Sequence, residues 1–355
     1  MERVNLDDVS VLHELDGKGM LGHVAALARQ CLDAWAAVRE LELPVRHMET
    51  HRVIVTGMGG SAIGGDLAAV VVEPHSLLPI QVLRGYGLPA YADRQTLVIA
   101  SSYSGNTEET LSSFRAARKR GCALVAVTTG GELARLAREW EVPLVTFGYK
   151  SQPRAALGYS LMSLLGVLRA RGLTGDLDAD LAAAAALLDE QEAVLAPTSP
   201  RVDNLAKRLA ADLAGHLPVV AGAGPLASVA CRWKTQFNEN AKAWAYYEPL
   251  PEMDHNALSG IDFPAPTPEW LRLLFLEGEG MHARNRLRLD LTQEIFEEHG
   301  VTCHRVPVPG ESPLAQILAG VQLGDYVSVY LAFLYGTDPT DIGAIVSLKD
   351  KMAEA

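Results

Sequence analysis

The sequence has few cysteines, and none of them forms a C-x-x-C pair. The four residues are Cys31, Cys122, Cys231 and Cys303. Because they are far apart and most have apolar or small neighbours, we expect reduced thiols packed in the interior. Reduced cysteines are typical of a cytoplasmic protein, and this is the location that we expect.

The chain also lacks an excess of positive charge. Its formal net charge is −12 at pH 7, whereas a nucleic-acid-binding surface requires a basic face. We therefore expect no nucleic-acid partner. An acidic protein can still bind a small anionic metabolite, because backbone N–H groups and hydroxyls bind such ligands locally.

Membrane-spanning and metal-binding signals are missing as well. No apolar run reaches the roughly 18–20 residues of a membrane span. The opening "MERVNLDDVS" is more acidic and polar than a signal peptide. The ten histidines are dispersed and form no HxH or HExxH motif. We therefore expect no membrane partner, no metal and no cofactor.

Apolar, β-branched runs alternate with helical segments in the first half of the chain. A strand, a glycine-rich turn and a helix are predicted over 52–72. Further strands are predicted at 80–85, 96–102, 123–129 and 142–147, with helices opening near Asn106 or Thr107 and over 132–140. This alternation is typical of a parallel sheet with helices on both faces.

The same order of elements returns in the second half. Residues 217–240 repeat the strand, glycine turn, serine and helix of 51–71, and further strands are predicted at 271–278 and 301–308. A long helix is predicted over 313–336. Because 355 residues exceed one ordinary core, we expect an α/β protein with two similar αβα sandwiches, related as a degenerate internal repeat.

The glycine turn "GMGGSAIGG" at 57–65 is the first candidate binding element. A dinucleotide site would need an acidic residue at the end of the second strand, but Arg84 stands there. Gly59, Gly60 and Ser61 instead supply backbone N–H groups and a hydroxyl at a helix N-terminus. This combination suits a single sugar or phosphate group.

The loop "SSYSGNTEET" at 101–110 follows a strand and is the second candidate. Ser102, Ser104 and Thr107 lie where that strand gives way to a helix, at the carboxyl edge of a parallel sheet, where such folds bind ligands. Helix capping is the alternative interpretation. Capping needs only one hydroxyl, so the richer loop predicts a phosphate site.

This loop and the preceding turn resemble the sugar-isomerase (SIS) domain, and the doubled pattern resembles the bifunctional phosphoglucose/phosphomannose isomerase family of archaea and bacteria. The resemblance implies an N-terminal SIS domain at 1–153, a helical connection at 154–200 and a C-terminal SIS domain at 201–355. It also implies interconversion of glucose 6-phosphate, and mannose 6-phosphate, with fructose 6-phosphate. A homodimer that shares its active sites is expected.

The segment 234–260 contains the candidate proton-transfer groups. Glu239 lies between two asparagines, and His255 follows sixteen residues later in "PEMDHNALSG". Alone, each is compatible with a solvated surface residue. The family resemblance implies that Glu239 moves a proton between C2 and C1 of the open-chain sugar, and partial burial would raise its pKa toward that of a general base. It also implies that His255, from the neighbouring subunit, assists ring opening.

Three further residues match the family pattern. Arg154, in "SQPRAALGYSL", matches an arginine near the reacting oxygens, where a fixed positive charge stabilises an enediolate. Lys349 matches a terminal lysine that assists ring opening, and Thr340 is a weaker candidate contact. Exposure to solvent is the alternative for Arg154 and Lys349.

Two departures from the pattern concern the second half. Asp254 stands where an amide is expected before the histidine, and Pro225 replaces a polar small residue in the second glycine turn. The second turn is therefore expected to form no phosphate pocket, which leaves one site per subunit. Two other functions stay open: a non-catalytic phosphosugar-binding SIS regulator, and an isomerase of another phosphosugar.

Overall fold

The computed structural model describes residues 4–264 and 267–354, and these divide into two compact units. Unit 1 comprises the described residues of Met1–Ala25, Glu190–Pro309 and Ala319–Ala355; unit 2 comprises Ala26–Asp189 and Gly310–Leu318. Each unit contains one parallel sheet. The expected α/β class with two parallel sheets is confirmed.

Unit 2 contains a five-stranded parallel sheet in the order β2-β1-β3-β4-β5. Its strands are β1 (Arg52–Thr56), β2 (Ile80–Leu83), β3 (Thr96–Ser102), β4 (Ala123–Thr128) and β5 (Leu144–Thr146). Every residue of β3 and β4 is buried. Central strands covered on both faces explain why these runs are apolar throughout rather than alternating.

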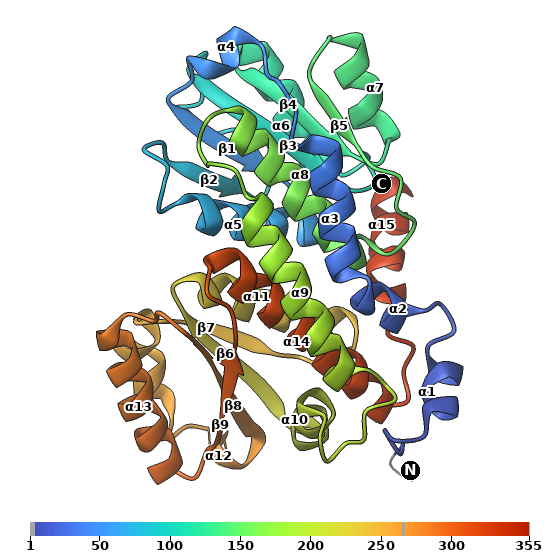
Figure 1. Ribbon diagram of the computed structural model, residues 1–355, viewed down its shortest axis with the longest axis vertical. Helices are drawn as coiled ribbons and strands as arrows, with labels where there is room; N and C mark the ends of the chain where they lie inside the picture. Colours follow the sequence, from blue (N-terminus) through green and yellow to red (C-terminus); the bar gives the residue numbers. More distant parts are fainter. Residues whose placement is uncertain (1–3, 265–266, 355) are drawn as a thin grey trace. The chain divides into compact units, whose positions relative to one another are not determined.

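Helices cover both faces of this sheet (Figure 1). On one face, α6 (Glu108–Arg120) and α7 (Gly131–Glu139) pack their apolar residues against Ile54, Val98 and Leu124. On the other, α5 (Gly59–Val72) approaches β1 closely, since a Cβ at Gly65 would lie 3.0 Å from Val55 Cγ1. The helix α8 (Leu157–Ala170) packs against both α5 and β4, and α3 (Leu27–Val38) packs against α8.

Unit 1 contains a four-stranded parallel sheet in the order β7-β6-β8-β9. The strands are β6 (Leu217–Ala223), β7 (Tyr246–Leu250), β8 (Leu271–Gly278) and β9 (Thr302–Val308). This order matches β2-β1-β3-β4 of unit 2, so the predicted repeat is confirmed at the level of topology. The sequence did not predict β7, because exposed aromatic and proline residues obscure its pattern.

The sheet of unit 1 also has helices on both faces. The helix α13 (Ala283–Glu298) packs Leu289 and Phe296 on the face that carries Leu273 and Phe275. The opposite face is covered by α11 (Pro225–Glu239) and by the C-terminal part of α14 (Pro313–Leu334). A Cβ at Gly320 of α14 would contact both Val229 and Val308.

The remaining helices are short or peripheral to the sheets. The α-helices are α1 (Val9–Leu15), α2 (Met20–Ala25), α4 (Val45–Met48), α9 (Asp178–Leu195), α10 (Leu205–Leu213), α12 (Thr267–Trp270) and α15 (Gly343–Glu354). The 3₁₀ helices are η1 (Pro153–Ala156), η2 (Glu252–His255) and η3 (Ala257–Gly260).

The helix α14 corrects one expectation from the sequence. Among the described residues it is the one helix long and apolar enough to cross a membrane, although no run of that length was expected. Its most apolar 18-residue window is 94% buried inside the protein. This burial identifies α14 as a core helix.

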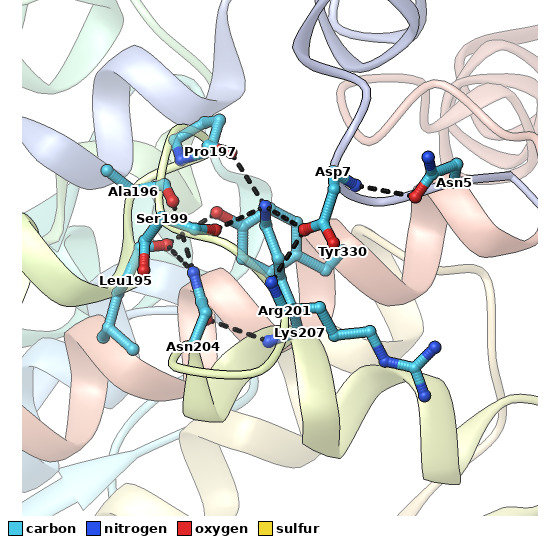
Figure 2. Close-up of polar contacts among 10 residues, drawn as sticks. All are labelled: Asn5, Asp7, Leu195, Ala196, Pro197, Ser199, Arg201, Asn204, Lys207 and Tyr330. Atoms are coloured by element: carbon cyan, nitrogen blue, oxygen red, sulfur yellow. Dashed lines mark hydrogen bonds and ion pairs between the residues drawn. The ribbon is translucent and has the colours of Figure 1, made fainter.

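The N-terminal segment is anchored to unit 1 by a buried lysine (Figure 2). The Nζ atom of Lys207 donates to Pro197 O (2.8 Å) and Ser199 O (2.7 Å) and pairs with Asp7 Oδ1 (3.1 Å). The same Asp7 oxygen accepts the backbone N–H of Arg201 (2.7 Å). A buried ammonium is tolerated because all these acceptors surround it.

The two units do not follow the boundaries expected from the sequence. Residues of Met1–Ala25 belong to unit 1, although they were expected in an N-terminal domain at 1–153. The helix α8 was expected in a connection, but it is a buried core helix of unit 2. Its Ala- and Leu-rich sequence could not distinguish a linker helix from a core helix.

None of the four cysteines, all of which the structure describes, forms a disulfide, as expected. Cys31 and Cys122 are buried, and Cys231 and Cys303 are partly buried. Burial raises the pKa of the Cys31 thiol to about 12, which keeps it protonated at neutral pH. Cys31 is therefore a packing residue rather than a reactive thiol.

Candidate active site

The hydroxyl loop lies directly after β3, at the carboxyl edge of the sheet of unit 2. Ser102 Oγ lies 2.9 Å from Thr107 Oγ1 and accepts the backbone N–H of Gly105 at 3.1 Å. Ser104 Oγ accepts the N–H of Asn106 at 3.2 Å. The structure therefore gathers the three predicted hydroxyls of this loop in one turn before α6.

Helix capping alone does not explain these hydroxyls. Thr107 occupies the N-cap position of α6, but its side chain makes no capping hydrogen bond. Its Oγ1 contacts Ser102 instead. The helix N-terminus also carries a partial positive charge, which is favourable for an anion at this turn.

The glycine turn lies beside the hydroxyl loop, because β1 and β3 are neighbours in the sheet. The helix α5 begins at Gly59, and the buried Ser61 accepts the backbone N–H of Tyr103 at Oγ (3.3 Å). A Cβ at Gly57 would lie 3.0 Å from Ser101 O, so the two turns approach too closely for a larger residue.

Tyr103 is a residue of this region that the sequence did not single out. Its hydroxyl donates to Tyr149 O (2.5 Å) and accepts the N–H of Ser151 (3.0 Å). It therefore ties the hydroxyl loop to the segment that precedes Arg154. The only signal in the sequence is that Tyr103 is the single aromatic residue in a loop of small polar residues.

Arg154 lies at the glycine turn. A Cβ at Gly60 would lie 3.1 Å from Pro153 O and 3.4 Å from Arg154 Cα, so a side chain at position 60 would press on η1. Gln30 Nε2 also holds η1 in place by donating to Ala155 O (2.9 Å). Arg154 is only 2% exposed, and the alternative that it faces water is wrong.

Unit 2 thus assembles seven of the predicted site residues around the carboxyl edge of one sheet. They are Gly59, Gly60, Ser61, Ser102, Ser104, Thr107 and Arg154. They combine hydroxyls, two helix N-termini and one buried guanidinium. This set of groups can bind a phosphorylated or otherwise anionic small molecule.

Glu239 belongs to unit 1 and is the last residue of α11. The flanking asparagines hold the chain on both sides of it. Asn238 Nδ2 donates to Ala243 O (2.8 Å), and Asn240 Nδ2 donates to Ser328 Oγ (2.9 Å). The amide N–H groups beside Glu239 therefore fix the end of the helix.

His255 ends η2, just after β7. It is exposed, whereas the preceding Asp254 is held by Arg288 Nη1 (3.1 Å) and Thr292 Oγ1 (2.9 Å) of α13. The aspartate that departs from the family pattern thus anchors the turn to α13. His255 is presented at the surface of unit 1 by this anchored turn.

Glu239 and His255 lie at opposite edges of the sheet in unit 1. The segment after Glu239 leads into the start of β7, which pairs with the start of β6 through Val219 and Tyr246. His255 follows the other end of β7. A five-residue strand separates these edges by roughly 15 Å, so one chain does not bring the two side chains together within unit 1.

The last two predicted residues also belong to unit 1. Thr340 is buried, and its backbone N–H donates to Asp338 Oδ1 (2.7 Å). Lys242 Nζ donates to Asn240 O (3.0 Å) and to Asp338 O, which joins the Glu239 turn to the Thr340 turn. Lys349 lies exposed on α15.

Within residues 4–264 and 267–354, no group of three or more His, Cys, Asp or Glu side chains has the arrangement of a metal site.

Comparison with known proteins identifies the class of this fold. The family model "Bacterial phospho-glucose isomerase C-terminal SIS domain" matches residues 202–352. The crystal structure of tagatose-6-phosphate ketose/aldose isomerase from Escherichia coli aligns with a TM-score of 0.67 at 16% identity, covering 95% of this chain and 96% of that one. The protein is thus a double SIS-type α/β protein.

Curated relatives define the family more narrowly. Bifunctional phosphoglucose/phosphomannose isomerase from Caldicellulosiruptor bescii is 38% identical over 94% of this chain and 99% of the relative. The protein of the same name from Aquifex aeolicus is 36% identical over 84% of this chain and 90% of the relative. The chain belongs to the bifunctional phosphoglucose/phosphomannose isomerase family, an enzyme family of the isomerase class.

Proposed function

We propose that the protein is an aldose–ketose isomerase of hexose 6-phosphates. It interconverts glucose 6-phosphate, and also mannose 6-phosphate, with fructose 6-phosphate by metal-free proton transfer through an enediolate. The two relatives named bifunctional phosphoglucose/phosphomannose isomerase, which align with this chain over nearly their whole length, support this assignment. The observation that carries it is the hydroxyl-lined sheet edge with a buried arginine beside it.

Unit 2 binds the phosphate group in this proposal. Ser61, Ser102, Ser104 and Thr107 donate hydroxyl hydrogens to the phosphate oxygens, and the backbone at Gly59 and Gly60 adds N–H groups at the start of α5. Neutral donors and helix dipoles stabilise the dianion without a lysine. The hydrogen bonds of the loop with Tyr103 and Gly105 keep these hydroxyls in place before substrate arrives.

The proton transfer is assigned to Glu239. The carboxylate removes the proton from C2 of the open-chain aldose and returns it to C1, while negative charge develops on the sugar oxygens. Arg154 stabilises this charge, and its effect is largest in the transition state because the enediolate is more negative than the substrate. Because Arg154 is buried, its guanidinium has little freedom to move, and a fixed positive charge suits this role.

Ring opening is assigned to His255 and Lys349, and Thr340 is a further substrate contact. We also propose that the protein is a homodimer in which His255 completes the site of the neighbouring subunit. The opposite positions of Glu239 and His255 on the sheet of unit 1 support this exchange. The site is proposed to act in the cytoplasm.

Replacing Glu239 tests the proposal. Glu239→Gln keeps the size and hydrogen-bonding capacity of the side chain but removes the base. We expect kcat with fructose 6-phosphate to fall by about 10²–10⁴-fold, the usual contribution of a positioned general base. Binding of the sugar phosphate, measured by calorimetry, should change little, because the phosphate contacts are untouched.

The control is Glu298→Gln, which removes an exposed carboxylate from the end of α13. Assays in EDTA should follow both aldose products. A fully active E239Q protein would contradict the assignment of the base. Fructose 6-phosphate that binds without turnover in the unaltered protein would favour a regulator, and turnover of another phosphosugar alone would favour a different isomerase.

A further inference from the structure

Asn240, which follows the proposed base Glu239, is a buried amide that is hydrogen-bonded to a neighbouring helix. It is the C-cap of α11, and its polar side chain is fully buried. A buried amide is costly unless it is hydrogen-bonded. Its Nδ2 donates to Ser328 Oγ of α14 (2.9 Å), and Ser328 Oγ donates to Asp325 O (2.7 Å).

The same two helices are joined at a second level, further from Glu239. Arg232 of α11 forms a two-point ion pair with Asp325 of α14, at 3.2 Å for Nε to Oδ1 and 2.8 Å for Nη2 to Oδ2. Both residues are buried. Asp325 therefore connects both levels, because its carboxylate binds Arg232 and its backbone carbonyl accepts from Ser328.

A third level is made by Trp233, whose Nε1 donates to Gly320 O (2.7 Å). Any side chain at Gly324 would collide with the same indole, so the two helices lie in close contact there. The ion pair and the indole hold the middle of α11. The Asn240–Ser328 bond instead ties the residue that follows Glu239 to α14.

We propose that Asn240 and Ser328 are positioning residues for the carboxylate of Glu239. The bond between them fixes the last turn of α11, so that the carboxylate has a defined place and direction when it transfers a proton. This inference rests on the proposed role of Glu239. Neither residue touches the substrate, and each acts through the helix end.

The physical reason for such a device is the sensitivity of proton transfer to distance. A displacement of about 1 Å can lower a reaction rate by roughly 10²-fold. The ends of helices fray because their last carbonyl groups have no intrahelical partners. A base on the final residue of a helix therefore benefits from a tertiary contact at the helix end, and the Asn240–Ser328 bond supplies one.

The test is Ser328→Ala, which removes one buried hydroxyl without adding bulk. We expect kcat to fall by roughly 10-fold or more while KM is retained, because Ser328 belongs to unit 1 and the proposed phosphate contacts belong to unit 2. With glucose 6-phosphate deuterated at C2, the isotope effect on kcat should be at least as large as in the unaltered protein. Ser328→Thr, which keeps the hydroxyl, should restore most of kcat.

A matched control exists in unit 2. Thr50 Oγ1 is buried, donates to the carbonyl three residues earlier (His47 O, 2.7 Å) and accepts one side-chain N–H (Arg171 Nε, 3.0 Å). Ser328 makes the same kind of pair of bonds. Thr50→Val should lower the melting temperature but leave kcat unchanged.

The outcomes separate this inference from the proposed function. If S328A keeps its full kcat, or if T50V loses as much kcat as S328A, the positioning role is wrong. If E239Q is fully active, the proposed base is wrong and the positioning inference fails with it. If E239Q is inactive and S328A is unaffected, only the positioning inference fails.

Discussion

Gly105 illustrates how one residue shapes the proposed phosphate loop. Its φ is +69°, a conformation that residues with a side chain rarely adopt. A Cβ there would also collide with Gly130 O and approach Thr128 Oγ1 to 2.9 Å. Both the positive φ and the lack of room for a Cβ therefore require glycine at this position. The N–H of Gly105 donates to Ser102 Oγ.

Gly105→Ala should therefore displace the loop while the sheet below it stays folded. We expect KM for fructose 6-phosphate to rise by about tenfold or more, since each hydrogen bond to a charged group contributes roughly 1.5–3 kcal/mol. Steady-state kinetics measure the effect. Gly148→Ala is the control, because a Cβ there meets nothing within 4 Å. An unchanged KM in G105A would count against phosphate binding by this loop.

At the scale of elements, close helix packing decides which segments form the core. The helix α8 lies against α3 so closely that a Cβ at Gly166 would lie 2.7 Å from Val38 Cβ. Both helices bury most of their residues in unit 2. A segment that was expected to connect two domains is instead a structural layer of one unit.

Gly166→Ala tests this packing. We expect it to destabilise the protein by about 1–3 kcal/mol, the usual cost of overpacking a core. Val38→Ala makes room for the new methyl group, so the double variant should lose less stability than the sum of the single variants. Urea unfolding curves measure all three. Additive losses would show that α3 and α8 do not constrain each other at this point.

At the scale of the whole molecule, the two units contribute different groups. Unit 2 has the hydroxyls and Arg154, whereas unit 1 has Glu239 and, at the other edge of its sheet, His255. If Glu239 and His255 act on one substrate, as we propose, the two residues come from different copies of the chain. This arrangement makes the proposed homodimer testable by mixing variants.

Mixed dimers of Glu239→Gln and His255→Ala should regain activity that neither variant has alone. Random exchange gives one complete site in each mixed dimer, so about a quarter of the unaltered activity is expected for a symmetric dimer. The measurement is isomerase activity after the two variants are unfolded and refolded together. Each variant refolded alone is the control. Mixtures that stay as inactive as the separate variants would contradict exchange of His255.

The succession of strands and helices along the chain and the chemistry of the loops could be predicted from local sequence. Runs such as 96–102 and 123–128 are apolar and β-branched, and they became buried central strands because few other structures can accommodate them. The hydroxyl loop and the glycine turn were recognisable because their composition cannot fill a core. The strand β7 was missed because its two tyrosines are exposed and it contains a proline, so it has no apolar, β-branched run.

Contacts between distant residues could be seen only in the folded chain. Nothing in the sequence indicates that Asn240 donates to Ser328, that Lys207 anchors the N-terminal segment, or that Arg154 is buried against Gly60. Each depends on how helices and turns pack, and packing is set by shape and by the satisfaction of buried polar groups rather than by periodicity. The sequence by itself thus indicates which side chains can bind and react, whereas tertiary packing decides which of them are held in place.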